Sequence, residues 1–194
     1  MQTSIITSMH EIFKRLYKRT MKYIFLDVDG VLNHEQWYED LDKNPDAPAF
    51  PYSCFDPQCV ARVNEILEAT GAQLVISSSW RLDKQLYSTL DSIGLKSKFE
   101  CTPVFKKSSS GLENFDCRGS EIREFLLAHK YNPETDNYVI VDDDSDMLDE
   151  QLPHFFQTAG DYWSKTMPLV EKNGGTGLTE TLKNRIISFL IHGE

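Results

Sequence analysis

The sequence has no apolar run of the roughly 18 residues that a membrane-spanning helix requires. Cysteines are few, and Cys54, Cys59, Cys101 and Cys117 lack the regular spacing of a disulfide framework. Cys54 and Cys59 could supply half of a zinc site, but no second close pair completes four ligands. We therefore expect no membrane span, reduced thiols rather than zinc ligands, and a reducing cytoplasmic setting.

Basic residues are also scarce, with 20 Lys and Arg against 30 Asp and Glu and a formal net charge of −10. This balance argues against an extended nucleic-acid-binding surface. Hydrophobic residues make up 40% of the 194 residues, enough for a core of ordinary size. The length favours one domain with at most a small insertion.

Residues 1–20 differ from the rest of the chain. Apolar residues recur at helical spacing between Met9 and Lys18 with basic residues among them, which predicts a short basic amphipathic helix. A secretory signal would need a longer apolar centre and a small-residue cleavage site. Because Met21 directly precedes the first predicted strand, we expect 1–20 to be a dispensable N-terminal extension and 21–194 to be the folded domain. Binding of the extension to a membrane surface is the alternative.

Apolar runs alternate with amphipathic segments along the rest of the chain. Strands are predicted at residues 22–27, 72–76, 101–105, 138–141 and 155–158. Helices are predicted from the cap Asp56 to the stop Gly71, over 82–93, from the cap Ser120 to 129, and over 178–191. This alternation is typical of a three-layer α/β fold with a parallel central sheet. The polar or weakly patterned residues 33–55 and 95–117 predict loop or flap insertions too short for a cap domain.

Polar side chains follow three of these strands. The strands end in Asp27-Val28-Asp29-Gly30, Ser77-Ser78-Ser79 and Asp142-Asp143-Asp144. In parallel sheets, ligands bind beyond the carboxyl ends of the strands, so these groups should converge on one edge. Carboxylates gathered there repel one another unless a hard cation such as Mg²⁺ binds between them.

The order of these segments resembles the four motifs of the haloacid dehalogenase (HAD) superfamily. The matching segments are Asp27-Val28-Asp29-Gly30-Val31-Leu32, Leu74-Val75-Ile76-Ser77, a basic residue ahead of a helix, and Val139-Ile140-Val141-Asp142-Asp143. The resemblance covers roughly residues 22–147 and is closest to a minimally capped, phosphatase-like branch that includes domains of proposed RNA-repair proteins. It implies a three-layer α/β/α Rossmann-like fold with only small cap insertions.

The resemblance also implies roles for the acidic residues. Asp27 would be the nucleophile that forms an aspartyl-phosphate, and Asp29 the general acid that later activates water. In the family, Mg²⁺ contacts the first aspartate side chain, the second aspartate main-chain carbonyl and an acid of the fourth motif. Here that acid would be Asp143, with Asp142 supporting it and Asp146 holding a metal-bound water.

Polar residues after the second strand are candidates for substrate binding. Ser77 is the expected phosphate-binding hydroxyl and Ser78 its close competitor, while a serine-rich turn without a ligand role is the alternative. Arg81 could hold a substrate phosphate and Trp80 could stack on a base. A solvated arginine and a half-buried tryptophan are the alternatives.

The basic residue of the third motif departs from the usual lysine before a proline-containing loop. Arg118, at the start of a predicted helix, is the best match and could neutralise both nucleophile and phosphoryl group. Lys106 and Lys107 are its rivals. His34 lies just past the first motif, where it is either a substrate contact from the flap or a plain surface histidine.

Together with these residues, the resemblance implies a Mg²⁺-dependent phosphatase that acts through an aspartyl-phosphate on a phosphorylated small molecule or nucleic-acid end. One alternative is a 3′-phosphate phosphatase acting on polynucleotide ends in repair, and another is a catalytically idle metal- or phosphate-binding module. Dehalogenase chemistry is disfavoured because it would leave Asp29 without a leaving group to protonate.

Overall fold

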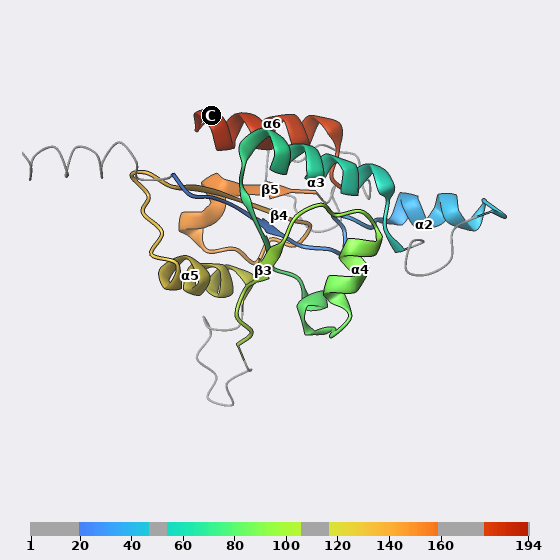
Figure 1. Cartoon of the computed structure of the whole chain (residues 1–194), viewed down its shortest axis with the longest axis horizontal. Helices are drawn as coiled ribbons and strands as arrows, with labels where there is room; N and C mark the ends of the chain where they lie inside the picture. The colour runs from blue at the N-terminus through green and yellow to red at the C-terminus, as the bar shows by residue number, and fades with distance from the viewer. Residues whose placement is uncertain (1–19, 47–53, 106–116, 159–176, 194) are drawn as a thin grey trace, which may run out of the picture.

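The computed structural model describes residues 20–46, 54–105, 117–158 and 177–193, which include a five-stranded parallel sheet (Figure 1). The strand order is β3-β2-β1-β4-β5, and each neighbouring pair is parallel. The strands are β1 (Lys22–Leu26), β2 (Gln73–Ile76), β3 (Phe99–Cys101), β4 (Asn137–Asp142) and β5 (Phe155–Gln157). The predicted parallel α/β fold is confirmed.

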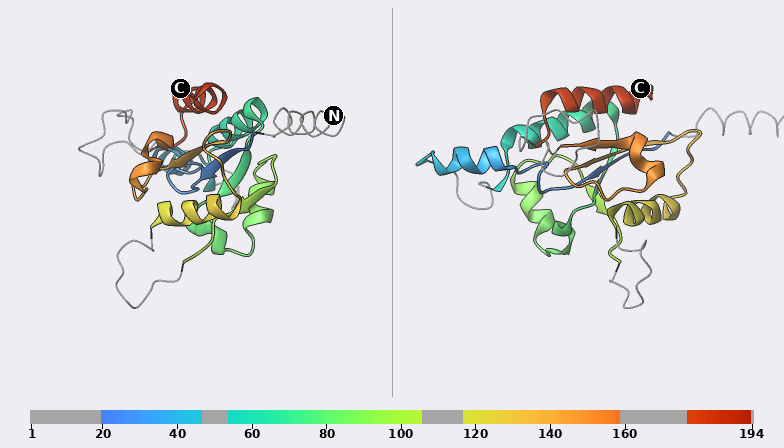
Figure 2. Two further views of the ribbon diagram at one scale, coloured as in Figure 1. Left: turned by 90° about the vertical axis from the view of Figure 1, so that its left-hand side faces the viewer. Right: turned by 180° about the vertical axis from the view of Figure 1, so that it is seen from behind.

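Helices cover both faces of this sheet (Figure 2). Helices α3 (Pro57–Thr70) and α6 (Glu180–His192) lie on one face, and α5 (Arg118–Ala128) lies on the other. Side chains of β1 alternate between two buried clusters: Ile24 and Leu26 pack on the α3–α6 side, whereas Phe25 packs on the α5 side. The same alternation places Asp27 beyond Phe25, on the side of α5.

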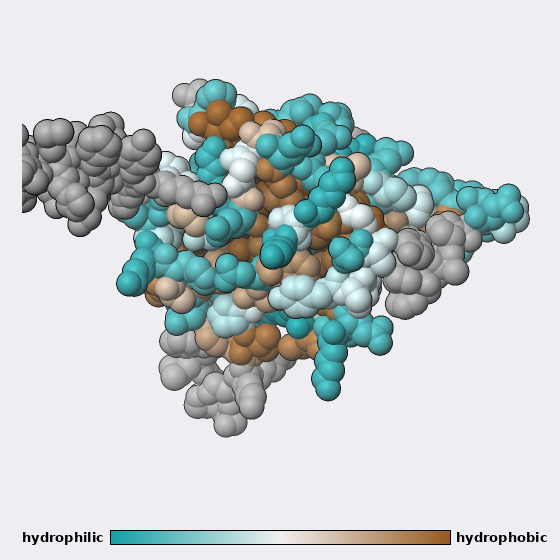
Figure 3. Space-filling view, in the orientation of Figure 1, coloured by the Kyte–Doolittle hydropathy of each residue, from teal (hydrophilic) through white to brown (hydrophobic). Residues whose placement is uncertain are grey.

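Part of the predicted flap at 33–55 is a helix, α2 (Glu35–Asp42), and that part of the prediction is wrong. His34 caps it by accepting a hydrogen bond from the Trp37 backbone N–H, and the segment contains no proline or glycine to interrupt a helix. The helix buries none of its residues and projects from the body as a hydrophilic arm (Figure 3).

The predicted helix at 82–93 is also shorter than expected. A 3₁₀ turn, η2 (Ser79–Leu82), comes first because Ser78 caps it, and the α-helix α4 runs only from Leu86 to Ser92. Leu82, expected on the apolar face, is 68% exposed. The backbone is extended at Asp83, which separates the two elements.

The end of strand β3 and the start of helix α5 both lie earlier in the chain than expected. Strand β3 ends at Cys101 instead of continuing to 105, because Pro103 has no N–H for the ladder. Helix α5 begins at Arg118 with Cys117 as its cap, so Ser120 lies inside the helix instead of capping it. A further 3₁₀ helix, η3 (Asp149–His154), precedes β5. The remaining elements agree with the prediction to within about two residues, while the expected helix at 9–18 lies outside the described residues.

None of the described helices is long and apolar enough to cross a lipid bilayer. The four cysteines, which all lie in the described ranges, form no disulfide, in agreement with the expected thiols.

Candidate functional site

The parallel register brings Asp27 and Asp142 to adjacent strand ends. Leu26 pairs with Val141, and the Asp27 backbone N–H donates to the Val141 carbonyl at 2.9 Å. Both side chains are buried, with Asp142 entirely inaccessible to solvent. Carboxylate oxygens of Asp27, Asp142 and Asp143 all lie within 4.8 Å of one another. The sheet edge therefore concentrates three acidic groups, as the sequence predicts.

Gly30 allows the turn after β1 to pass close to Asp143. Its φ is +68°, in the left-handed region that favours glycine. A Cβ at this position would collide with the Asp143 carboxyl group. Any other residue here would displace either the turn or the third carboxylate of the cluster.

Arg118 is the cation that the described residues bring to this cluster. Its Nη1 lies 3.2 Å from Asp27 Oδ1 and its Nε lies 3.7 Å from Asp142 Oδ2. The Arg118 backbone N–H donates to Asp146 Oδ2 at 2.9 Å, so Asp146 anchors the start of α5. The rival residues Lys106 and Lys107 lie outside the described residues.

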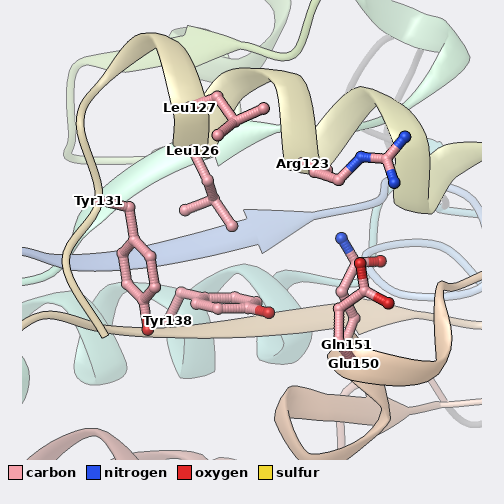
Figure 4. A pocket seen from close by; sticks show the side chains of 7 residues that line it. All are labelled: Arg123, Leu126, Leu127, Tyr131, Tyr138, Glu150 and Gln151. Atoms are coloured by element: carbon pink, nitrogen blue, oxygen red, sulfur yellow. The ribbon is translucent and has the colours of Figure 1, made fainter. Parts of the chain in front are cut away.

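Buried Gln151 also fixes the start of α5. Its Nε2 donates to the Gly119 carbonyl at 2.8 Å, and its Oε1 accepts from the Leu148 backbone N–H at 3.0 Å. Gln151 borders a cavity of about 200 Å³ between α5 and the β4–η3 region (Figure 4). The cavity is lined by Arg123, Leu126, Leu127, Tyr131, Tyr138, Glu150 and Gln151, and includes none of the clustered acids.

Burial makes the acidic cluster hold protons more strongly than exposed carboxyls do. Burial and the neighbouring Asp27 raise the pKa of Asp142 to about 8 and that of Asp143 to about 6. Burial also raises the pKa of Asp27, although Arg118 and a hydrogen bond from the Ser78 hydroxyl oppose the rise. Ionising all three acids therefore requires more positive charge than Arg118 alone supplies.

Both candidate serines are completely buried at the end of β2, in different surroundings. Ser78 bonds to the Asp27 carboxylate and also caps η2. The Ser77 backbone N–H donates to the Leu26 carbonyl and so continues the ladder between β2 and β1. The Ser77 Oγ has no hydrogen-bond partner among the described residues. Ser77 therefore has an unused hydroxyl beside β1, whereas the Ser78 hydroxyl already contacts Asp27.

Arg81 lies in a buried ion pair, which contradicts the solvated-arginine alternative. Its Nη2 lies 2.6 Å from Glu121 Oε1, and its Nη1 donates to the Ser78 carbonyl at 2.6 Å. The side chain is only 7% exposed, so it is not a solvated arginine. Its charge is neutralised within the fold, where it ties η2 to α5.

Asp29 and Trp80, from different strand ends, are in direct contact. The indole Nε1 donates to both carboxylate oxygens of Asp29, at 3.0 and 2.9 Å. Asn33 Nδ2 also donates to Asp29 Oδ1, at 2.8 Å. Asn33 was not among the residues predicted from sequence. Its position four residues after Asp29, in the turn after β1, is the feature that indicates a contact with Asp29.

His34 belongs to a second buried group, with Asp56 and Cys59. The Trp37 backbone N–H donates to His34 Nδ1, so Nε2 carries the hydrogen and donates to Asp56 Oδ2 at 3.0 Å. A ring in this tautomer offers no lone pair at Nε2 to a metal. Burial raises the pKa of the Cys59 thiol to about 12. His34 therefore joins α2 to α3, and because it is buried, the expectation of a plain surface histidine is wrong.

The acidic cluster, in contrast, fits a hard divalent cation. Its three residues offer oxygen ligands only, the donor set that suits Mg²⁺. Asp142 Oδ2 is buried without a hydrogen-bond partner among the described residues, and Arg118 Nε is 3.7 Å away. A cation would compensate this oxygen and the raised proton affinity of its neighbours.

A family model described as the HAD domain in Swiss Army Knife RNA repair proteins matches residues 23–181. No curated protein and no solved structure gives a significant match to the chain. The matched range includes the three polar strand ends, the start of α5 and the five-stranded parallel sheet. The chain therefore belongs to the HAD superfamily, in the family of HAD domains from these repair proteins.

Proposed function

We propose that this protein is a Mg²⁺-dependent phosphatase that hydrolyses phosphate monoesters through an aspartyl-phosphate on Asp27. The proposal rests mainly on one observation. Asp27 is buried at a strand end, 3.2 Å from Arg118, with its carboxylate within 4.8 Å of those of Asp142 and Asp143. Family membership supports a hydrolase of the phosphatase type.

In the first step, a carboxylate oxygen of Asp27 attacks phosphorus and the bond to the leaving oxygen breaks. Asp29, in its protonated form, gives its proton to that oxygen, so the alcohol leaves neutral. In the second step, Asp29 takes a proton from water, and the water oxygen attacks phosphorus. Inorganic phosphate leaves and the Asp27 carboxylate is restored.

Other groups around Asp27 would stabilise the transferring phosphoryl. Arg118 can donate to Asp27 and to a phosphoryl oxygen, and the unused Ser77 hydroxyl can donate to another. Asp27, Asp143 and the Asp29 main-chain carbonyl would hold Mg²⁺, with Asp142 in support. Bound there, Mg²⁺ would neutralise charge on the phosphoryl oxygens and on the clustered acids.

A panel of phosphate esters tests this function directly. Purified protein should release phosphate from at least one aryl or sugar phosphate with Mg²⁺ present, and release none in excess EDTA. The control is a parallel reaction in which Mg²⁺ is restored after EDTA treatment. Phosphate release from no ester in a broad panel, combined with Mg²⁺ binding by calorimetry, would instead identify a catalytically idle metal-binding module.

The family description names RNA repair proteins, which supports a second candidate function, removal of 3′-phosphates from polynucleotide ends. A 3′-phosphorylated oligonucleotide belongs in the same panel for this reason. A value of kcat/KM for the oligonucleotide well above that of any small ester would favour repair, and the reverse order would favour a metabolite substrate.

The raised pKa values predict how stability depends on pH. An Asp142 carboxyl with a pKa near 8 in the folded protein and 3.8 when unfolded binds more protons in the folded state between those values. The free energy of unfolding of metal-free protein should therefore fall as the pH rises through this window. Saturating Mg²⁺ should remove much of the loss because it binds the ionised carboxylates.

Thermal denaturation between pH 5 and 8, in EDTA and in Mg²⁺, measures this effect as a change in Tm. The variant Asp143→Asn removes the carboxyl whose pKa is about 6 and should therefore make the metal-free profile less steep below about pH 6. A Tm at pH 8 that does not respond to Mg²⁺ would contradict the proposed cation site.

A further inference from the structure

The Asp29 side chain is exposed, yet two neighbouring side chains hold it. Three donor contacts converge on its carboxylate: Trp80 Nε1 at 3.0 Å from Oδ1 and 2.9 Å from Oδ2, and Asn33 Nδ2 at 2.8 Å from Oδ1. Oδ1 accepts from both donors, whereas Oδ2 shares only the indole N–H. The two oxygens of Asp29 therefore have different surroundings.

Both donors are themselves fixed in place. Asn33 is only 4% exposed, and its Oδ1 accepts the Gly30 backbone N–H at 3.0 Å, which sets the orientation of the amide. The Trp80 ring packs edge-on against buried Phe55, with ring centroids 5.3 Å apart. The carboxylate is thus held between the loop after β1 and the turn after β2.

The chemistry of these donors determines where a proton on Asp29 would reside. An indole N–H and an amide NH₂ can only donate, so each needs an acceptor oxygen whether or not Asp29 is protonated. A protonated carboxyl keeps one good acceptor oxygen and carries its hydrogen on the other. Because Oδ1 already accepts two hydrogen bonds, the proton belongs on Oδ2.

We infer that Trp80 and Asn33 are positioning residues, which hold Asp29 so that its Oδ2 presents the proton to the leaving group. The inference rests on the proposed function, since it assigns the general acid of that reaction. It gives Trp80 a different role from the base stacking that its sequence position suggested.

The test measures how kcat/KM depends on the leaving group, because this ratio reports on the steps up to formation of the phosphoenzyme. p-Nitrophenolate leaves readily without a proton, whereas phenol and simple alcohols need one. Trp80→Phe keeps a ring against Phe55 and removes the N–H. We expect kcat/KM to fall about 10-fold or more for phenyl and alkyl phosphates but only about twofold for p-nitrophenyl phosphate.

Two further variants support the comparison. Asp29→Asn should show the steepest dependence on the leaving group, and Asn33→Ala an intermediate one. Asn33→Ala also provides the test if the Trp80 variant does not fold, as judged by circular dichroism.

The outcomes separate this inference from the proposed function. If the wild-type protein hydrolyses none of the esters, the phosphatase assignment fails and the positioning role fails with it. If the wild type is active and both folded variants keep the wild-type dependence on the leaving group, only the positioning role is refuted. A uniform loss across the series refutes it equally, because that pattern indicates weaker binding or a disturbed fold.

Discussion

Replacing Asp27 with Asn is expected to lower kcat on the order of 10⁴-fold or more for any phosphate ester that the protein hydrolyses. The asparagine side chain has nearly the same shape but carries no anionic oxygen to attack phosphorus. Phosphate release under saturating Mg²⁺ measures the effect. Circular dichroism and Tm show whether the variant is folded.

Asp144→Asn is the matched control for this variant. Asp144 is exposed and lies two residues beyond Asp142. Its backbone N–H donates to Asp142 Oδ1, and this bond remains when the Asp144 side chain is replaced. We expect its activity to stay within about threefold of the wild type, the modest effect usual for an exposed surface position. An Asp27→Asn rate within tenfold of the wild-type rate would disprove the nucleophile assignment.

Replacing Arg118 with Ala should reduce kcat/KM by about 10²–10³-fold, the usual effect of removing one donor that stabilises transition-state charge. The arginine contacts Asp27 at 3.2 Å and Asp142 at 3.7 Å, so its loss removes the guanidinium that partly neutralises both carboxylates. Arg118→Lys should recover only part of the rate, because an ammonium cannot reach two carboxylates with a planar fork of donors.

Arg123→Ala is the matched control on the same helix. Arg123 is exposed, lies in α5 beside the cavity of Figure 4, and is not among the residues of the acidic cluster. Steady-state kinetics on one ester should show a large loss for Arg118→Ala and little change for Arg123→Ala. Equal effects of the two substitutions would contradict a specific role for Arg118.

The proximity of Asp27 to Asp142 and Asp143 could be predicted from sequence because it depends on two simple rules of sheet architecture. Buried apolar strands alternating with helices form a parallel sheet, and the carboxyl ends of its strands share one edge. Gly30 after the first pair of acids, together with the acids at the end of β4, therefore indicates the site from sequence alone. Arg118 does not follow from these rules: it is the best match to the third motif of the HAD resemblance, as a basic residue at a helix start.

Other contacts could not be predicted in this way, because they depend on how loops pack. The pairing of Arg81 with Glu121 joins segments 40 residues apart, and an isolated basic residue near a strand end looks like a substrate contact. The Trp80 indole reaches Asp29 from a 3₁₀ turn at Ser79–Leu82, which the apolar pattern of the sequence does not predict. His34 acts as a helix cap, a role for which histidine is not a typical residue.

The most direct test of the account is to trap the phosphoenzyme. Protein quenched in acid during turnover of a p-nitrophenyl ester, with Mg²⁺ present, should carry one added phosphoryl group by intact mass spectrometry. Peptide mapping should locate it on Asp27, and Asp27→Asn should carry none. A phosphoryl group on another residue, or steady phosphate release with no labelled protein at any quench time and full activity in Asp27→Asn, would contradict the proposed mechanism.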